Sequence, residues 1–194
     1  MPRWEPNATD RLVRAALDLF IEQGYDDTTV AQIAERAGLT KSTFFRHFPD
    51  KREVLFVGQD RTAQLLAEAI AAAAGDATPL EAVAAALDAA GTAFTPDQRD
   101  LGAPRLAVIA ANPELQERDT LKRARFAATM TTALRARGLP DPVASLAAEI
   151  GVLALRRAAV RWADPASERP FHELAVKALD ELNDASTSLG ERNS

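Results

Sequence analysis

One glycine and two residues at fixed distances from it restrict how the N-terminal region can fold. Gly38 follows the small residue Ala34 by four positions and precedes the bulky apolar residue Phe44 by six. Where two short helices cross at roughly 90–120°, these are the positions at which they touch. Gly38 can also adopt the positive φ that a tight turn between such helices requires. Residues 28–51, TTVAQIAERAGLTKSTFFRHFPDK, therefore predict a helix-turn-helix.

Capping residues and apolar periodicity predict the helices around this turn. A first helix is expected over residues 9–23, where apolar residues recur every three to four positions. Thr29 followed by Gln32 has the pattern of a capping box and predicts the start of a second helix. Thr40 is expected to cap a third helix, which ends near residue 48 because Pro49 cannot continue it.

The outward face of the third helix carries groups that suit DNA. With a turn of about 100° per residue, Phe44 and Phe48 face inward. The residues predicted on the other faces are Lys41, Ser42, Thr43, Phe45 and Arg46. Residues 36–52 contain five basic residues and one acidic residue, although the whole chain has a net charge of -5. Local positive charge of this kind favours phosphate binding confined to one surface.

The stretch from Gly24 to Lys51, G-Y-x-x-T-T-V-x-x-I-A-x-x-A-G-L-T-x-x-T-F-F-x-H-F-x-x-K, resembles the DNA-binding domain of the tetracycline-repressor (TetR) family. The resemblance implies an all-α fold of about nine helices. It also implies two domains, a helix-turn-helix domain at residues 1–49 and a ligand-binding and dimerisation domain at residues 50–194. The last residues, from about 185, are expected to be disordered.

Carried over by motif position, the resemblance implies a set of DNA contacts. Base edges are assigned to Lys41, Ser42 and Phe45, and phosphates to Thr29, Thr43, Arg46, His47 and Lys51. Phe45 departs from the family pattern, in which tyrosine is common, and loses a hydroxyl bond worth about 1 kcal/mol. His47 has an alternative role, since it could instead cap its helix or pack beside Phe48.

Prolines and glycines divide the rest of the chain into further helices. The expected ranges are 50–74, 78–94, a sixth helix interrupted near Gly102 and Pro104 and reaching 111, then 113–137, 141–163 and 167–184. The eighth helix is rich in small residues, such as Ala147 and Gly151, which allow close helix approach. The resemblance places a homodimer interface on residues 141–163 and 168–184, and a buried core within one chain remains the alternative.

A small-molecule effector is the second partner that the resemblance implies. Bulky residues on the fifth to seventh helices are candidates for its pocket: Phe94, Leu106, Ile109, Phe126 and Met130, with ordinary core packing as the alternative. Arg105 lies in an apolar run, and if buried it needs a carboxylate or an anionic ligand as partner. The segment RLAVIAANPEL resembles a subgroup of the family linked to acyl-CoA-like effectors.

Composition narrows the function further. The chain contains no cysteine, two histidines far apart in sequence and no cluster with metal-ligand spacing, so we expect no enzyme activity, cofactor or metal. Neither a signal peptide nor a membrane span is expected, which favours the cytoplasm. The predicted function is a homodimeric repressor that binds a palindromic operator and is released by a small hydrophobic or acyl-type effector. The alternative is a helical small-molecule-binding protein or interaction module with a vestigial DNA-binding head.

Overall fold

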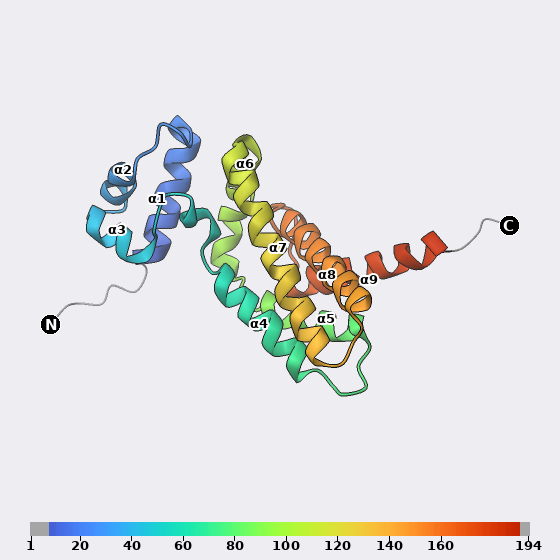
Figure 1. Cartoon of the computed structure of the whole chain (residues 1–194). Helices are drawn as coiled ribbons and strands as arrows, with labels where there is room; N and C mark the ends of the chain where they lie inside the picture. Colours follow the sequence, from blue (N-terminus) through green and yellow to red (C-terminus); the bar gives the residue numbers. More distant parts are fainter. Residues whose placement is uncertain (1–7, 191–194) are drawn as a thin grey trace. The chain divides into compact units, whose positions relative to one another are not determined.

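The computed structural model describes residues 8–190, and over this range the chain is all-α, as predicted (Figure 1). Nine α-helices and two short 3-10 helices form its regular structure, with no β-strand among the described residues. Two compact units are present. One comprises the described residues up to 57 together with 104–119, and the other comprises 58–103 together with the residues from 120 onward. In the described range, no helix is long and apolar enough to cross a membrane.

The first unit is organised around the apolar face of α1 (Ala8–Gln23). This helix contacts α2 (Val30–Arg36), which in turn contacts α3 (Lys41–His47), and a 3-10 helix, η1 (Glu53–Phe56), also packs on α1. Side chains buried at its centre are Leu12, Leu17, Ile33, Phe44, Phe48 and Leu55. The predicted inward direction of Phe44 and Phe48 is therefore confirmed.

The caps predicted for α2 and α3 are present. Thr29 accepts the N–H of Gln32 at 3.3 Å, and Gln32 Oε1 accepts the N–H of Thr29 at 2.8 Å, so the capping box is complete. At the next helix, Thr40 accepts the N–H of Thr43 at 3.1 Å. Between the two helices Gly38 has a φ of 65°, the positive value that the turn was expected to need.

The prediction of a continuous fourth helix over residues 50–74 is wrong. The 3-10 helix η1 ends at Phe56, the chain turns at Gly58 with a φ of 82°, and α4 (Gln59–Ala72) starts only after this turn. Glycine adopts this left-handed conformation at little cost, so the sequence permits a break that an apolar stripe alone does not reveal.

A residue from a distant helix binds the start of η1. Asp50 accepts the N–H groups of Arg52 at 2.8 Å and Glu53 at 3.3 Å, so half of a capping box forms. The other half is missing, because the Glu53 carboxylate binds Arg118 instead of returning to the N–H of Asp50. The cap therefore supports one short 3-10 turn.

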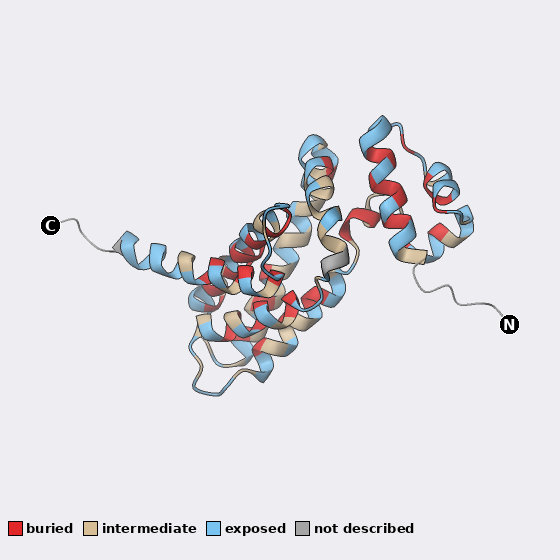
Figure 2. Cartoon of the chain, turned by 180° about the vertical axis from the view of Figure 1, so that it is seen from behind, coloured by how far each residue is buried: buried red, intermediate tan, exposed pale blue. Residues whose placement is uncertain are grey.

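The second unit is a helical bundle with an alanine-rich core (Figure 2). Its helices are α4, α5 (Pro79–Gly91), the part of α7 (Pro113–Ala136) from residue 120 onward, α8 (Asp141–Trp162) and α9 (Phe171–Gly190). In this bundle, α5 packs against α4, α8 and α9, and α8 packs against α9. A Cβ on Gly151 would lie 2.8 Å from Val83, so a larger residue would separate α8 from α5.

Three elements connect α5 to α8 along the chain. A 3-10 helix, η2 (Pro96–Leu101), leads into α6 (Gly102–Ala111), so the interruption predicted near Gly102 is a change of helix type. After it α7 (Pro113–Ala136) begins as predicted, with Asn112 Oδ1 accepting the N–H of Leu115 at 3.2 Å. This one helix contributes residues to both compact units.

The ninth helix was predicted at residues 167–184, and both ends are wrong. It begins at Phe171 because Arg99 donates to the carbonyls of Ser167 and Arg169, which holds the residues before Pro170 in a loop. At the other end α9 continues to Gly190, with serine and threonine hydroxyls of its last turns bonded to the helix's own carbonyls. Residues 191–194 of the predicted tail lie outside the described residues.

Candidate nucleic-acid interface

The third helix presents the outward face that the sequence predicts. Phe44 is fully buried and anchors α3, while the next residue, Phe45, is 49% exposed and lies edge-on to it with ring centroids 5.6 Å apart. Lys41 Nζ lies 5.9 Å from the centre of the Phe45 ring. Ser42 and Arg46 are exposed on the same short helix. An apolar ring, a hydroxyl and two cations are thus free to meet a DNA groove.

Hydrogen bonds within the unit orient two more of the predicted contacts. Thr43 shares a hydroxyl–hydroxyl bond of 2.9 Å with Thr40 at the start of α3. At the other end of α3, His47 Nδ1 lies 3.2 Å from Thr9 Oγ1, so a bond links the end of α3 to the start of α1. If the threonine donates, the proton of the neutral imidazole lies on Nε2, which can then donate to a phosphate.

The local positive charge is smaller than residue counting indicates. Arg36 forms a two-pronged ion pair with Glu22, with N–O distances of 2.9 and 2.7 Å, and this bonding holds the pKa of the Glu22 carboxyl below its usual value. Lys51 Nζ donates to backbone carbonyls. Among residues 8–190, Lys41 and Arg46 have no carboxylate partner, so α3 carries two cations that no ion pair neutralises.

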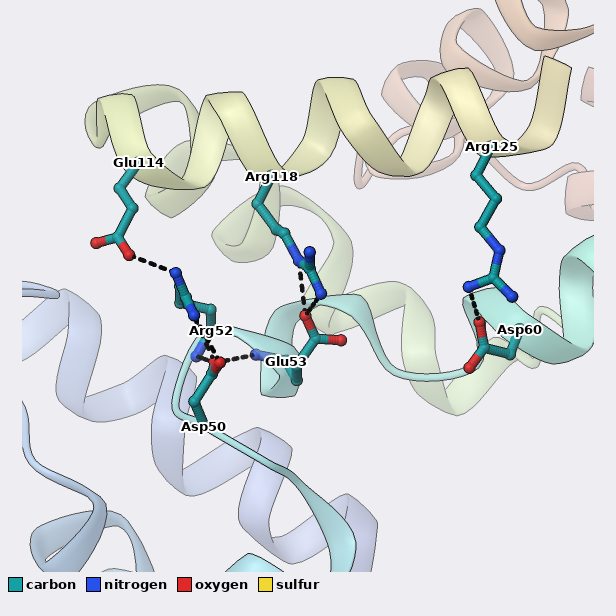
Figure 3. A network of polar contacts seen from close by, with 7 residues as sticks. All are labelled: Asp50, Arg52, Glu53, Asp60, Glu114, Arg118 and Arg125. Atoms are coloured by element: carbon teal, nitrogen blue, oxygen red, sulfur yellow. Dashed lines mark hydrogen bonds and ion pairs between the residues drawn. The ribbon is translucent and has the colours of Figure 1, made fainter. Parts of the chain in front are cut away.

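Arg52 forms ion pairs with two carboxylates (Figure 3). Its guanidinium donates to Asp50 at 2.8 Å and to Glu114 at 2.8 Å, and the bond to Arg52 lowers the pKa of the Asp50 carboxyl. Next to it, the carboxylate of Glu53, whose side chain is only 14% exposed, receives two bonds from Arg118. These pairs tie the start of η1 to the first turns of α7 within the same unit.

A cation that sequence reasoning missed holds the turn of the helix-turn-helix. Arg11, on α1, donates to the carbonyls of Ala37 and Gly38. A Cβ at Gly38 would lie 2.7 Å from Arg11 Nη2, so a larger residue would displace the guanidinium, while the positive φ is what favours glycine here. An arginine beside the apolar stripe of α1 was the available signal, but only the fold shows that it reaches the turn.

The predicted effector residues divide between the two units. Arg105, Leu106 and Ile109 are half-buried on α6 in the first unit. Arg105 Nε is buried without a hydrogen-bond partner, and burial lowers the pKa of its guanidinium. No ion pair reaches it within residues 8–190, so the carboxylate partner considered for it is absent from the described chain.

The remaining candidates belong to the second unit and pack in its core. Phe94 stacks on Phe171 with ring centroids 3.8 Å apart and lies edge-on to Trp162. Met130 is fully buried beside Gly151, and Phe126 is half-buried against the same core. All three residues pack against this core, and their role in binding an effector stays a prediction. Within the described range, no group of acidic and histidine side chains could hold a metal ion.

The eighth helix has two different apolar faces. Its small residues, including Ala147 and Gly151, are buried in the chain's own core, so close helix packing within one chain accounts for them. A second set is exposed: Val143, Leu146, Leu153 and Val160. The intervals of three and seven residues put this set on one stripe of α8. The structure thus separates a face that the chain covers from one that it leaves open.

Comparisons with known proteins agree with this architecture. Residues 12–56 match the model of the family described as bacterial regulatory proteins, tetR family. The regulator TcmR of Streptomyces glaucescens is 40% identical over 80 residues, which cover 41% of this chain and 35% of that protein. The class A tetracycline repressor protein of transposon 1721, from Escherichia coli, is 40% identical over 55 residues, or 28% of this chain and 24% of its own. The chain therefore spans about a third or less of these relatives.

A solved structure extends the likeness to the whole fold. SmeT, the repressor of the Stenotrophomonas maltophilia multidrug efflux pump SmeDEF, aligns over 91% of this chain and 89% of its own with a TM-score of 0.56. At 20% sequence identity this likeness establishes a shared fold and nothing about ligands. The fold likeness covers the C-terminal helices that the family match does not reach.

Replacing Arg11 with methionine should loosen the turn between α2 and α3. The variant keeps an apolar side chain of similar length but loses the N–H donors to the carbonyls of Ala37 and Gly38. The free energy of opening the turn should therefore fall by about 1 kcal/mol. Amide hydrogen exchange at Gly38 and Leu39, whose N–H groups bond to Glu35 and Ala34, measures this directly. The control is Arg14→Met, at an exposed position of the same helix. Unchanged protection in Arg11→Met would contradict the assignment.

Proposed function

Because residues 12–56 match the model of the tetR family of bacterial regulatory proteins, we propose that the chain is a ligand-responsive transcriptional regulator that reads DNA through α3. The observation that carries the proposal is the exposed face of α3, on which Lys41 and Arg46 lack carboxylate partners beside the exposed ring of Phe45. Residues 1–49 would read DNA, and residues 50–194 would dimerise and bind the effector. The repressor named among its relatives supports repression as the mode of regulation.

The proposed contacts are assigned by motif position to residues that the first unit exposes wholly or in part. Lys41, Ser42 and Phe45 would meet base edges, with the Phe45 ring suited to a thymine methyl group. Thr29, Thr43, Arg46 and His47 would meet phosphates. Two copies would place two such helices on half-sites about 34–36 Å apart, one helical turn of DNA, which requires a palindromic operator.

Removal of one phosphate contact should change how DNA binding depends on salt. For Arg46→Ala we expect weaker binding at all sequences and a slope of log K against log salt that is smaller by about one. The probe is a duplex that the wild-type protein selects from a random library, titrated at several salt concentrations. Arg14→Ala, also an exposed arginine of the first unit, should keep the wild-type slope. Failure of the wild type to select any duplex would overturn the proposed function.

The exposed stripe of α8 supports the homodimer. Four apolar side chains lie in a row there, with Leu146 at 63% and Val160 at 58% exposure. Monomeric proteins rarely leave such patches uncovered, and a second copy paired by two-fold symmetry would bury them. We propose that α8 and α9, in the ranges predicted as 141–163 and 168–184, form the interface.

Introducing a charge on this stripe should weaken the dimer. Leu146→Glu would bury an unpaired carboxylate at the interface, and we expect a shift toward monomer by at least tenfold in dissociation constant. Analytical ultracentrifugation measures the change. The matched control is Leu121→Glu on α7, where the leucine is 57% exposed but lies outside the stripe. Equal dimerisation of both variants would argue against α8 as the interface.

Arg105 supports an effector with an acidic or acyl-type anionic group. The Nε of Arg105 is buried without an acceptor, which is costly for a charged group, and an anionic ligand group would supply the acceptor that the described chain lacks. Leu106 and Ile109 flank it on α6 and would contact an apolar tail. We propose that the effector's negative group binds Arg105 and that binding disfavours the DNA-bound dimer.

Replacing Arg105 with methionine should remove the response to acids while preserving DNA binding. In the wild type we expect decanoate, but not decanol, to release the selected duplex and to raise the melting temperature. In Arg105→Met the decanoate effect should fall at least tenfold, and the free protein should be no less stable because an unpaired buried charge is gone. Equal responses to decanoate in both proteins would refute the role of Arg105.

A further inference from the structure

Lys51 is bonded inside the first unit through all of its ammonium hydrogens. Its Nζ donates to the backbone carbonyls of Tyr25 at 2.7 Å, Thr28 at 3.1 Å and Asp26 at 3.3 Å. An ammonium group has three N–H donors, and three carbonyls match that number. The same Nζ lies 4.2 Å from the centre of the Tyr25 ring, within the range of a cation–π contact.

Lys51 completes the hydrogen bonding of the loop between α1 and α2. Of the five carbonyls from residue 24 to residue 28, the carbonyl of Gly24 accepts the Thr28 hydroxyl at 2.7 Å and that of Asp27 accepts the amide of Gln23 at 3.1 Å. Lys51 binds the other three, of which the carbonyl of Tyr25 also accepts the N–H of Thr28 at 3.3 Å. Tyr25 and Thr28 are buried, and backbone carbonyls without partners are costly where water is scarce, so the lysine stabilises this part of the loop.

The position of Lys51 in the chain gives these bonds a mechanical role. The lysine follows the end of α3 by four residues, and the loop that it binds leads directly into Thr29, the cap of α2. The bonds therefore close the helix-turn-helix into a ring, in which the residues after α3 are held to the residues before α2. Arg11 holds the turn between the two helices from α1.

We propose that Lys51 is a positioning residue of the DNA-reading surface, which sets the angle of α2 and α3 and does not bind a phosphate itself. This inference rests on the proposed function. A phosphate could recruit Lys51 only by breaking three hydrogen bonds from a charged donor and leaving three carbonyls without it. Lys41 and Arg46, which have no such bonds, are free to neutralise phosphates without that loss.

Salt titrations distinguish positioning from phosphate contact. With the duplex selected by the wild type, Lys51→Met should bind on the order of tenfold more weakly at every salt concentration, because the reading surface is misaligned while the number of phosphate contacts is unchanged. Its salt slope should equal that of the wild type, whereas the slope of Arg46→Ala should fall. Lys51→Arg, which can donate to the same carbonyls, should recover part of the affinity. A slope reduced by about one in Lys51→Met would overturn the proposal.

A spectroscopic measurement on the wild type avoids any dependence on a variant's folding. Tyr25 is the chain's single tyrosine, so ring-labelled tyrosine gives one set of NMR signals that report the Lys51 contact. On saturation with the selected duplex these signals should stay near their free positions. Movement toward the positions seen in Lys51→Met would show that the lysine has left the ring for DNA, which would overturn the proposal.

The two measurements separate failure of the inference from failure of the proposed function. If the wild type selects no duplex, the regulator assignment fails and the inference fails with it. If the wild type binds, then the salt slope and the Tyr25 signals decide the role of Lys51 alone.

Discussion

Backbone carbonyls at the ends of helices and in loops need hydrogen-bond partners, and in this chain long cationic side chains from other segments supply them. Arg11 reaches the end of α2, and Lys51 reaches the loop after α1. In the second unit Arg137 does the same at the end of α4, where it donates to the carbonyls of Ala73 at 2.7 Å and Ala74 at 2.5 Å. Such bonds join elements that are distant in sequence, so the arrangement of helices in each unit depends on them.

This use of cations changes what positive charge means near the helix-turn-helix. Residues 36–52 resemble a broad basic surface when their charges are counted, but Arg36 and Arg52 pair with carboxylates and Lys51 binds carbonyls. The pairs involving Arg36 and Arg52 are largely exposed, and such pairs contribute at most about 1 kcal/mol each. Their main effect is therefore to orient side chains and to neutralise charge. A protein of net charge -5 would then attract DNA through the short face of α3.

Features that depend on neighbours in sequence were predictable, and those that depend on distant partners were not. The caps at Thr29 and Thr40 lie within three residues of the groups they bind, and the burial of Phe44 follows from helical periodicity. By contrast, the break before α4 involves Arg118, which lies 65 residues beyond Glu53, and the late start of α9 involves Arg99, 68 residues before Ser167. No local pattern contains that information. Of the site, the orientation of α3 was predictable, while the bonding of Lys51 and Arg11 was not.

The eighth helix shows why composition alone could not locate an interface. Small residues suggested close packing between two chains, yet Ala147 and Gly151 pack inside one chain, where a side chain at position 151 would displace α5. The same helix also carries Leu146 and Val160 on an exposed stripe. A helix that is apolar on two faces has two surfaces to bury, and its own bundle covers only one. The open stripe, rather than the small residues, is therefore the physical reason to expect a second copy of the chain.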